Sequence, residues 1–241
     1  LTGADGRIAR IVNALSWTSF DFGPTLLEWM ERAAPDTYAQ VLAADRESRE
    51  RVGFGNAMAS PYHHVILPLG SRRDVVTEVR WGIADFRRRF GRVPEGMWLP
   101  ETAVDDVTLD VLAEHGVAFT IVAPHQVARP PARGLPGLYR TGTGREIALF
   151  VYDGALSHDV AFGVALKDGS AWARRMLEGA GAAHSVVSVA TDGETFGHHH
   201  RFAEMALARM VEDVQRRAAA TLTNFAAVLA KRRPSERVTL V

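Results

Sequence analysis

The stretch GMWLPETAVDDVTLDVLAEHGVAFTIV, residues 96–122, decides the fold class. Its apolar segment Gly96–Leu99 precedes a helix expected over 104–115, which Gly116 closes. The β-branched and aromatic residues Phe119–Val122 then predict a strand. A helix that joins two strands in this way is typical of a parallel crossover unit. This order predicts an α/β fold with parallel strands.

The same alternation extends along the chain in both directions. Pro24 suits the first position of a helix, Ser71 with Asp74 resembles a capping box, and Gly91 suits a C-terminal cap. We expect strands at 17–22 and 186–190, a hairpin of 138–140 and 147–152, and helices at 24–32, 36–49, 72–90, 170–180 and, in one or two pieces, 199–230. Strands that alternate with long helices favour a parallel sheet, either as a barrel or as an open sheet.

Composition narrows the class of protein. The chain has 241 residues, 28 basic and 28 acidic side chains, 47% apolar residues and no Cys. We expect one folded domain over residues 1–241, without disulfides or a thiolate nucleophile. Zero net charge argues against a nucleic acid or an anionic membrane as the main partner. No apolar run approaches the ~18 residues of a membrane span.

The two ends of the chain are unusual for a complete protein. The first residues, Leu1–Asp5, have neither an initiator Met nor the pattern of a signal peptide, and Arg237–Val241 reads like the start of a strand. We therefore expect a domain that is truncated at both ends, and a cytoplasmic location.

Two carboxylates lie just past apolar strand-like segments. Glu101 follows Gly96–Leu99, and Asp192 follows Val186–Ala190 within the sequence TDGETFGHHH. The C-terminal ends of parallel strands carry the active site in α/β folds. Ordinary roles stay open for both: Glu101 could favour a helix dipole, and the 192–200 segment could be a capped helix start with solvent-facing His.

A pair of carboxylates on different strands suits the chemistry of glycosidic bonds. One carboxylate attacks the anomeric carbon, and the other protonates the leaving oxygen. Retaining enzymes hold the pair about 5–5.5 Å apart, and inverting enzymes about 6.5–9.5 Å.

Two further segments carry polar residues beside apolar runs. In SPYHHVILPL, residues 60–69, we expect a functional role for His64 rather than for His63. In LFVYDGALSHDVAF, residues 149–162, Asp153 follows a predicted strand, and Asp159 could be an ordinary acid at a helix start.

Together these four segments resemble glycoside hydrolase family 57, the α-glucan enzymes with a (β/α)7 barrel. The chain is similar to a family-57-like branch known as a domain of unknown function. The resemblance implies an incomplete (β/α)7-type barrel, with Glu101 as the nucleophile and Asp192 as the general acid/base. It places His64 in the second motif, and Ser157 and Asp159 at matching positions.

The sequence departs from the family pattern at several places. The first family motif, a strand ending in His-Gln-Pro, has no counterpart. His198 replaces a frequent Glu, Gly193 a frequent aromatic residue, and Tyr152 a frequent Arg. Contacts with substrate are therefore expected to differ from those of amylolytic members.

The favoured function is a retaining glycoside hydrolase or glucanotransferase that acts on oligo- or polysaccharide α-glucans, without a metal or other cofactor. Its expected substrate-binding residues are His64, Trp98, Tyr152, Asp153, Asp159 and His199. One alternative is a metal-dependent carbohydrate deacetylase that uses Asp192 and His198–His200. The other is a carbohydrate-binding relic without turnover. The sequence does not indicate an oligomeric state.

Overall fold

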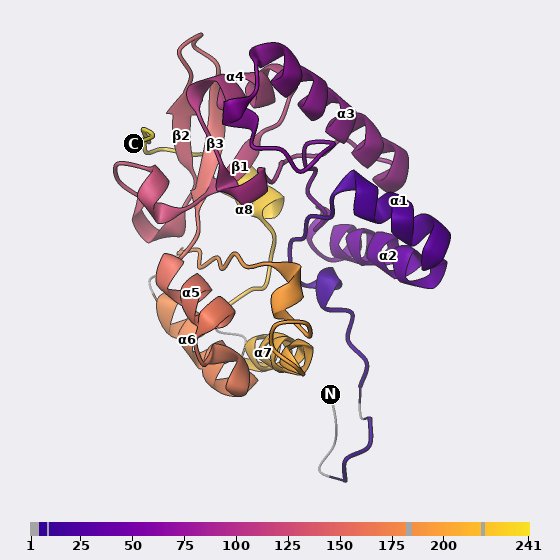
Figure 1. Cartoon of the computed structure of the whole chain (residues 1–241). Coiled ribbons are helices and arrows are strands. Elements are labelled where there is room, and N and C mark those ends of the chain that lie inside the picture. Colours follow the sequence, from indigo (N-terminus) through magenta and orange to yellow (C-terminus); the bar gives the residue numbers. More distant parts are fainter. Residues whose placement is uncertain (1–4, 9, 182–184, 218–219) are drawn as a thin grey trace.

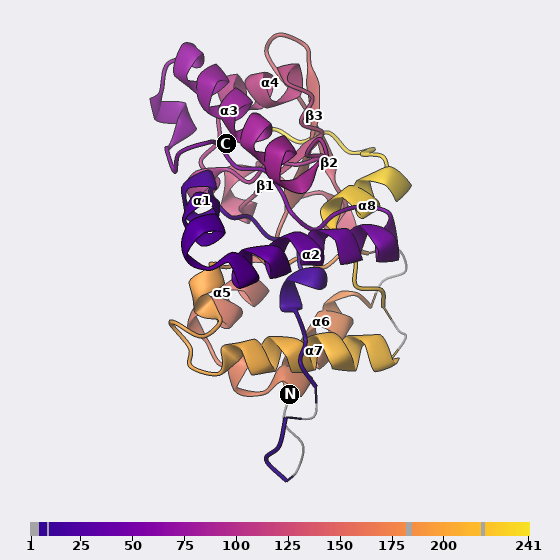
Figure 2. The ribbon, with the colours of Figure 1, turned by 90° about the vertical axis from the view of Figure 1, so that its right-hand side faces the viewer.

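The computed structural model describes residues 5–8, 10–181, 185–217 and 220–241. Figures 1 and 2 show α5, α6 and α7 together at one end of the molecule, with the strands, α3 and α4 at the other. The α-helices are α1 (Pro24–Ala33), α2 (Pro35–Val52), α3 (Arg72–Phe90), α4 (Asp106–Glu114), α5 (Gly154–Phe162), α6 (Gly169–Gly179), α7 (Ala203–Arg217) and α8 (Phe225–Lys231). The strands are β1 (Phe119–Val122), β2 (Gly137–Arg140) and β3 (Glu146–Val151).

Short 3-10 helices occupy several of the connections. They are η1 (Ala14–Ser16), η2 (Leu67–Leu69), η3 (Pro100–Thr102), η4 (Pro124–Gln126), η5 (Ala132–Gly134), η6 (Ala165–Lys167) and η7 (Gly193–Thr195). η3 contains Glu101, and η7 begins directly after Asp192.

The strands form a three-stranded sheet in the order β1-β3-β2. β1 pairs with β3 in parallel, and β2 pairs with β3 as the predicted antiparallel hairpin. Single parallel bridges continue the sheet from β1, in the order Gly96–Phe119, Ala59–Met97 and Phe20–Ala57. Five chain segments therefore run side by side in the same direction, and their C-terminal ends share one edge.

The α/β prediction is confirmed, but the expected barrel is not: in the described residues only β1–β3 form a continuous sheet. The predicted strands at 17–22 and 96–99 are reduced to single bridges. Segment 186–190 forms no strand, and the run after His64 ends in η2, where Pro68 lacks the N–H that a strand ladder needs.

Local capping signals located the helices well. The Ser71 Oγ accepts a hydrogen bond from Asp74 N, and Asp74 Oδ2 accepts one from Ser71 N, which completes the predicted capping box of α3. Gly91 ends α3 in the left-handed conformation with φ 66°. The helical region expected at 199–230 consists of α7 and α8.

Apolar side chains divide into a main cluster and two smaller ones. Ile147, Leu149 and Val151 of β3 face the main cluster, while Ala148 and Phe150 face a second cluster that includes α8. This alternation is the two-residue period of a strand with both faces covered. A third cluster lies between α6 and α7 around Trp172. None of the helices described is both long and apolar enough to cross a membrane.

Candidate active site

Glu101 lies in a strained turn at the shared edge of the parallel segments. Glu101 and Thr102 adopt φ values of 55° and 53°, in a region that residues other than glycine rarely occupy. Gln126 Nε2 holds the turn by donating to the Thr102 carbonyl at 2.7 Å. Such strain persists only where surrounding contacts impose it, and it is common at functional sites. The turn leaves the Glu101 side chain 72% exposed.

His64 is the predicted site residue that the structure brings directly to Glu101. Its Nε2 atom lies 3.4 Å from Glu101 Oε1, and both side chains are open to solvent. The backbone explains this approach, because Trp98 N donates to the Ala59 carbonyl at 2.8 Å and so aligns the two segments. A protonated His64 would form an ion pair with the carboxylate.

Trp98 and Tyr152 share one environment. Both rings are partly buried against the cluster that contains Phe119 and Phe150. Burial raises the pKa of the Tyr152 phenol, so this side chain stays neutral over the ordinary pH range. The two rings give the edge of the sheet an apolar surface beside the polar groups.

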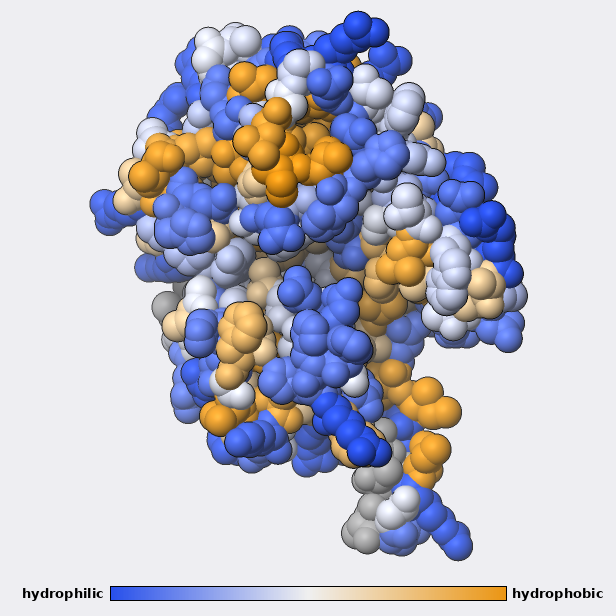
Figure 3. Space-filling view, viewed as in Figure 1, coloured by the Kyte–Doolittle hydropathy of each residue, from blue (hydrophilic) through white to orange (hydrophobic). Residues whose placement is uncertain are grey.

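Asp192 is exposed at the N-terminal end of η7, and its side chain makes no capping bond there. The preceding segment is attached to the end of β3, because Asp153 N donates to the Ser188 carbonyl at 2.8 Å and Ala190 N donates to Ser157 Oγ at 3.1 Å. These two bonds attach the segment before Asp192 to the region just past β3, and a meeting of Asp192 with Glu101 stays a prediction. Figure 3 shows a hollow in this face of the molecule, between the half with β1–β3 and the half with α5–α7.

Asp153 and Asp159 have protein partners. Asp153 caps α5 by accepting from Leu156 N at 2.9 Å. Asp159 lies inside α5 rather than at a helix start; it pairs with Arg175 and accepts from Val164 N at 3.1 Å. These contacts hold α5 in place, and a role of either carboxylate in sugar binding stays a prediction.

His199 lines a cavity of about 1070 Å³ together with Phe202 and residues of α7. The His198 and His199 rings lie 5.2 Å apart, while His200 Nε2 is bonded to the Ala161 carbonyl at 2.8 Å. Within the described part of the chain, no three His, Asp or Glu side chains converge in a way that could hold a metal ion. Asp192 and His198–His200, the metal ligands of the deacetylase alternative, therefore do not form such a group in this structure.

Asp21 is a candidate that the sequence analysis missed. It directly follows Phe20, at the end of the first of the parallel segments, and its Oδ1 atom is buried without a hydrogen-bond partner. Burial raises the pKa of Asp21 to about 7, and the neighbouring Ser60 hydroxyl offsets only part of that rise. A perturbed carboxyl at this edge is a typical active-site signal. Only its position after an alternating segment could have revealed it in the sequence.

Comparison with known proteins defines the class. The model of Glycosyl hydrolase family 57 matches residues 16–240, so the chain belongs to this family. Among curated proteins, α-amylase 1 of Dictyoglomus thermophilum is 28% identical over 102 residues, which cover 42% of this chain and 14% of the amylase.

Solved structures show the same fold. The 4-α-glucanotransferase of Thermococcus litoralis matches with a TM-score of 0.69 and 20% identity, over 94% of this chain and 34% of that enzyme. An exo-type maltose-forming amylase of Pyrococcus sp. ST04 matches with a TM-score of 0.75 and 17% identity, over 91% of this chain and 38% of the amylase. A putative polysaccharide deacetylase of Mycobacterium smegmatis matches with a TM-score of 0.61 and 16% identity, over 90% and 79%. The chain thus spans about a third of the length of the first two solved relatives.

Proposed function

We propose that this chain carries the catalytic site of a retaining glycoside hydrolase or glucanotransferase that acts on α-glucans. The observation that carries the proposal is the strained, exposed Glu101 beside His64. Membership of family 57 supports the substrate class.

In the proposed mechanism, a Glu101 oxygen attacks the anomeric carbon as the bond to the leaving oxygen breaks. Asp192 gives its proton to that oxygen, so the leaving sugar departs as an alcohol. Asp192 then takes a proton from water or from a sugar hydroxyl, whose oxygen displaces Glu101 from the glycosyl-enzyme. Water gives hydrolysis, and a sugar hydroxyl gives transfer.

The proposed mechanism needs a curved sheet, because a flat one would keep the two acids too far apart. In the proposed arrangement the segment before Asp192 lies beside the end of β3, so β1 and β3 separate the two acids by three strand spacings, about 14 Å in a flat sheet. A retaining pair needs about 5–5.5 Å between its carboxyl groups. We therefore propose that the parallel segments are part of an incomplete (β/α)7 barrel, whose curvature turns both carboxylates toward one centre.

The remaining predicted residues would bind the sugar around this pair. His64 would bind a hydroxyl or orient Glu101, and the partly buried rings of Trp98 and Tyr152 would pack against apolar sugar faces. Asp153, Asp159 and His199 complete the proposed set, with the first two acting mainly through the position of α5.

Substitution of each acid tests the proposal on maltoheptaose, with released reducing ends and transfer products as the measurement. Glu101→Gln and Asp192→Asn are each expected to lower kcat by about a thousand-fold or more. A 4-nitrophenyl α-maltoside needs little protonation of its leaving group, so Asp192→Asn should form the glycosyl-enzyme from it more readily than from maltoheptaose.

Glu194→Gln is the matched control, because Glu194 is an exposed acid in the same turn as Asp192. This variant is expected to keep wild-type activity. Wild-type rates in both Glu101→Gln and Asp192→Asn would contradict the assignment. Metal-dependent release of acetate from an acetylated glycan, without glycan cleavage, would replace it by the deacetylase hypothesis.

A further inference from the structure

Three aromatic side chains form a group beside the proposed site, which we call the aromatic platform: Tyr62, His63 and Trp81. The ring of Tyr62 lies edge-on to the other two, 4.9 Å from His63 and 5.7 Å from Trp81 between centroids. The rings of His63 and Trp81 are 6.5 Å apart. Trp81 is 53% exposed, and the His63 side chain is 49% exposed. Neither the proposed mechanism nor the main apolar cluster uses this group.

Glu78 of α3 holds the platform in position. Its carboxylate accepts from His63 N at 2.8 Å and lies 2.9 Å from His63 Nδ1, so one side chain fixes both the backbone and the ring. The Glu78 carbonyl also accepts from Tyr62 N at 3.1 Å. The Glu78 side chain is only 14% exposed. The rings are therefore arranged before any ligand arrives, which lowers the entropy cost of binding.

Gly82 permits this close attachment of the loop to α3. A Cβ atom at position 82 would overlap the Ser60 carbonyl oxygen. Glycine inside a helix is destabilising relative to alanine. The close approach of the loop to α3 therefore comes with a less stable helix. The loop and helix act as one unit that presents Trp81.

The platform is next in the chain to His64, the residue that contacts the proposed nucleophile. His63 belongs to the platform, and His64, the next residue, contacts Glu101 at 3.4 Å. A glucan chain bound at Glu101 and extended over this loop would reach the exposed indole of Trp81. Sugars present apolar C–H faces and polar edges, and a rigid group of indole, phenol and imidazole matches both.

We propose that Tyr62, His63 and Trp81 form an additional subsite that binds a glucosyl unit of the α-glucan, away from the bond that is cleaved. The proposal rests on the proposed function for its substrate class. It predicts a preference for longer chains, because a short ligand at Glu101 would not extend to Trp81.

Calorimetric binding of maltoheptaose and of maltose to the full chain tests the subsite. Trp81→Ala is expected to weaken maltoheptaose binding by about ten-fold and to leave maltose binding unchanged. Trp81→Phe keeps an aromatic face and should recover part of the lost affinity. Trp29→Ala is the matched control, because Trp29 of α1 is 54% exposed and should leave both affinities unchanged.

The outcomes separate this subsite from the catalytic proposal. Wild-type affinity for maltoheptaose in Trp81→Ala, or an equal loss in Trp29→Ala, overturns the subsite whatever the activity of the enzyme. Wild-type activity in Glu101→Gln, together with a loss in Trp81→Ala that is specific to maltoheptaose, would overturn the mechanism but not the subsite. Thermal unfolding of each variant at the wild-type temperature shows that the loss concerns binding rather than folding.

Discussion

At the scale of single residues, the protonation of Asp21 links the candidate site to stability. The folded-state pKa is about 7 and the ordinary value is 3.8. Between about pH 4 and pH 7 the unfolded chain releases this proton while the folded protein keeps it, so the free energy of unfolding falls as pH rises through that window. Above pH 7 the penalty is complete.

Asp21→Asn removes this ionisation and is expected to stabilise the protein at pH 8, by up to about 4 kcal/mol. At pH 4.5 the variant and the wild type should differ much less, because Asp21 is protonated in the folded wild type. Urea unfolding at the two pH values measures both differences. An equal difference at pH 4.5 and pH 8 would show that Asp21 does not titrate as a buried group.

Site residues could be predicted from the sequence where the residues next to them in the chain indicated their position. Glu101 follows a recognisable apolar segment and His64 precedes another, and the structure places the two side chains in contact. Asp21 was missed because its burial comes from the folded structure, and its neighbour Ser60 lies almost forty positions further along the chain. The partners of Asp159 could not be predicted either, because Arg175 lies on a different helix.

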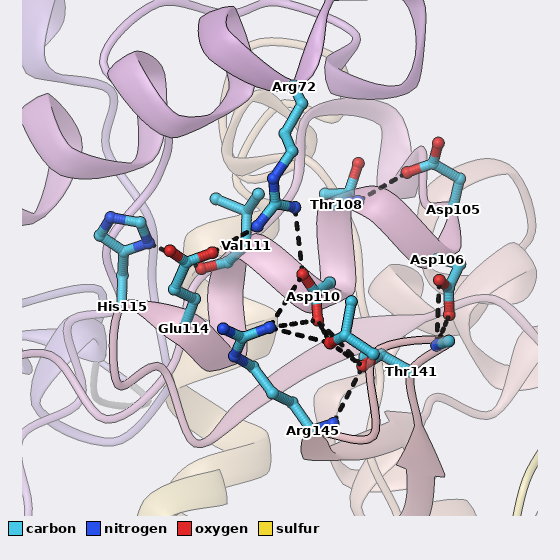
Figure 4. A network of polar contacts seen from close by, with 12 residues as sticks. Arg72, Asp105, Asp106, Thr108, Asp110, Val111, Glu114, His115, Thr141 and Arg145 are labelled. Carbon is cyan, nitrogen blue, oxygen red and sulfur yellow. Dashed lines mark hydrogen bonds and ion pairs between the residues drawn. The ribbon is translucent and has the colours of Figure 1, made fainter.

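At the scale of elements, α4 is tied to its neighbours through Asp110. Figure 4 shows its carboxylate between Arg72 at the start of α3 and Arg145 and Thr141 of the β2–β3 turn. Each of the three donates to Asp110 at 3.0 Å, and the Asp110 side chain is only 2% exposed. Although burial opposes it, the hydroxyls of Thr143 and Thr141 and the Arg145 guanidinium hold the pKa of Asp110 at about 2.

Asp110→Asn is expected to lower the free energy of unfolding by about 2–3 kcal/mol at pH 7, because it removes a buried charge from two guanidinium partners. The native pKa lies below the ordinary value of 3.8, so this stabilisation is present above pH 4 and disappears as pH falls through 2. Urea unfolding at pH 7 and pH 3 measures the gap, which should narrow at the lower pH.

The exposed Asp36 on the first turn of α2 provides the comparison. Asp36→Asn should change stability by less than about 1 kcal/mol, since only a helix dipole favours its charge. A cost for Asp110→Asn as small as that for Asp36→Asn would contradict the role given to this network.

Helices were easier to predict than strands for a physical reason. The start and end of α3 depend on Ser71, Asp74 and Gly91, which are all within or next to the helix. A strand depends on partners far away in sequence, and segments 96–99 and 186–190 have the apolar composition of strands without a continuous ladder.

At the scale of the whole molecule, Asn224 joins parts that are distant in the chain. Its Nδ2 atom donates to the Phe54 carbonyl at 2.9 Å and to Asn56 Oδ1 at 3.0 Å, while its Oδ1 atom caps α8 by accepting from Ala227 N at 2.9 Å. Asn224 is buried. One side chain therefore connects α8 to the turn that follows α2.

Asn224→Ala is expected to lower the free energy of unfolding by about 2–4 kcal/mol, because it removes the amide that donates to several oxygens of this turn, leaving Ser48 as the side-chain donor there, and it removes a helix cap. Thermal and urea unfolding measure the loss. Asp168→Ala is the matched control, since Asp168 caps α6 from an exposed position, and its cost should be clearly smaller. An equal loss of unfolding free energy in the two variants would show that the bonds from Asn224 to residues 54–56 do not contribute to stability.

The bonds of Asn224 also set an order of events during synthesis. The turn at 53–56 leaves the ribosome early, but its buried polar groups receive their amide donor only after some 170 further residues have been translated. Until then Ser48 of α2 is the side chain that can donate to the Phe54 carbonyl and to Asn56 Oδ1, so the polar contacts of this turn are completed only when α8 arrives.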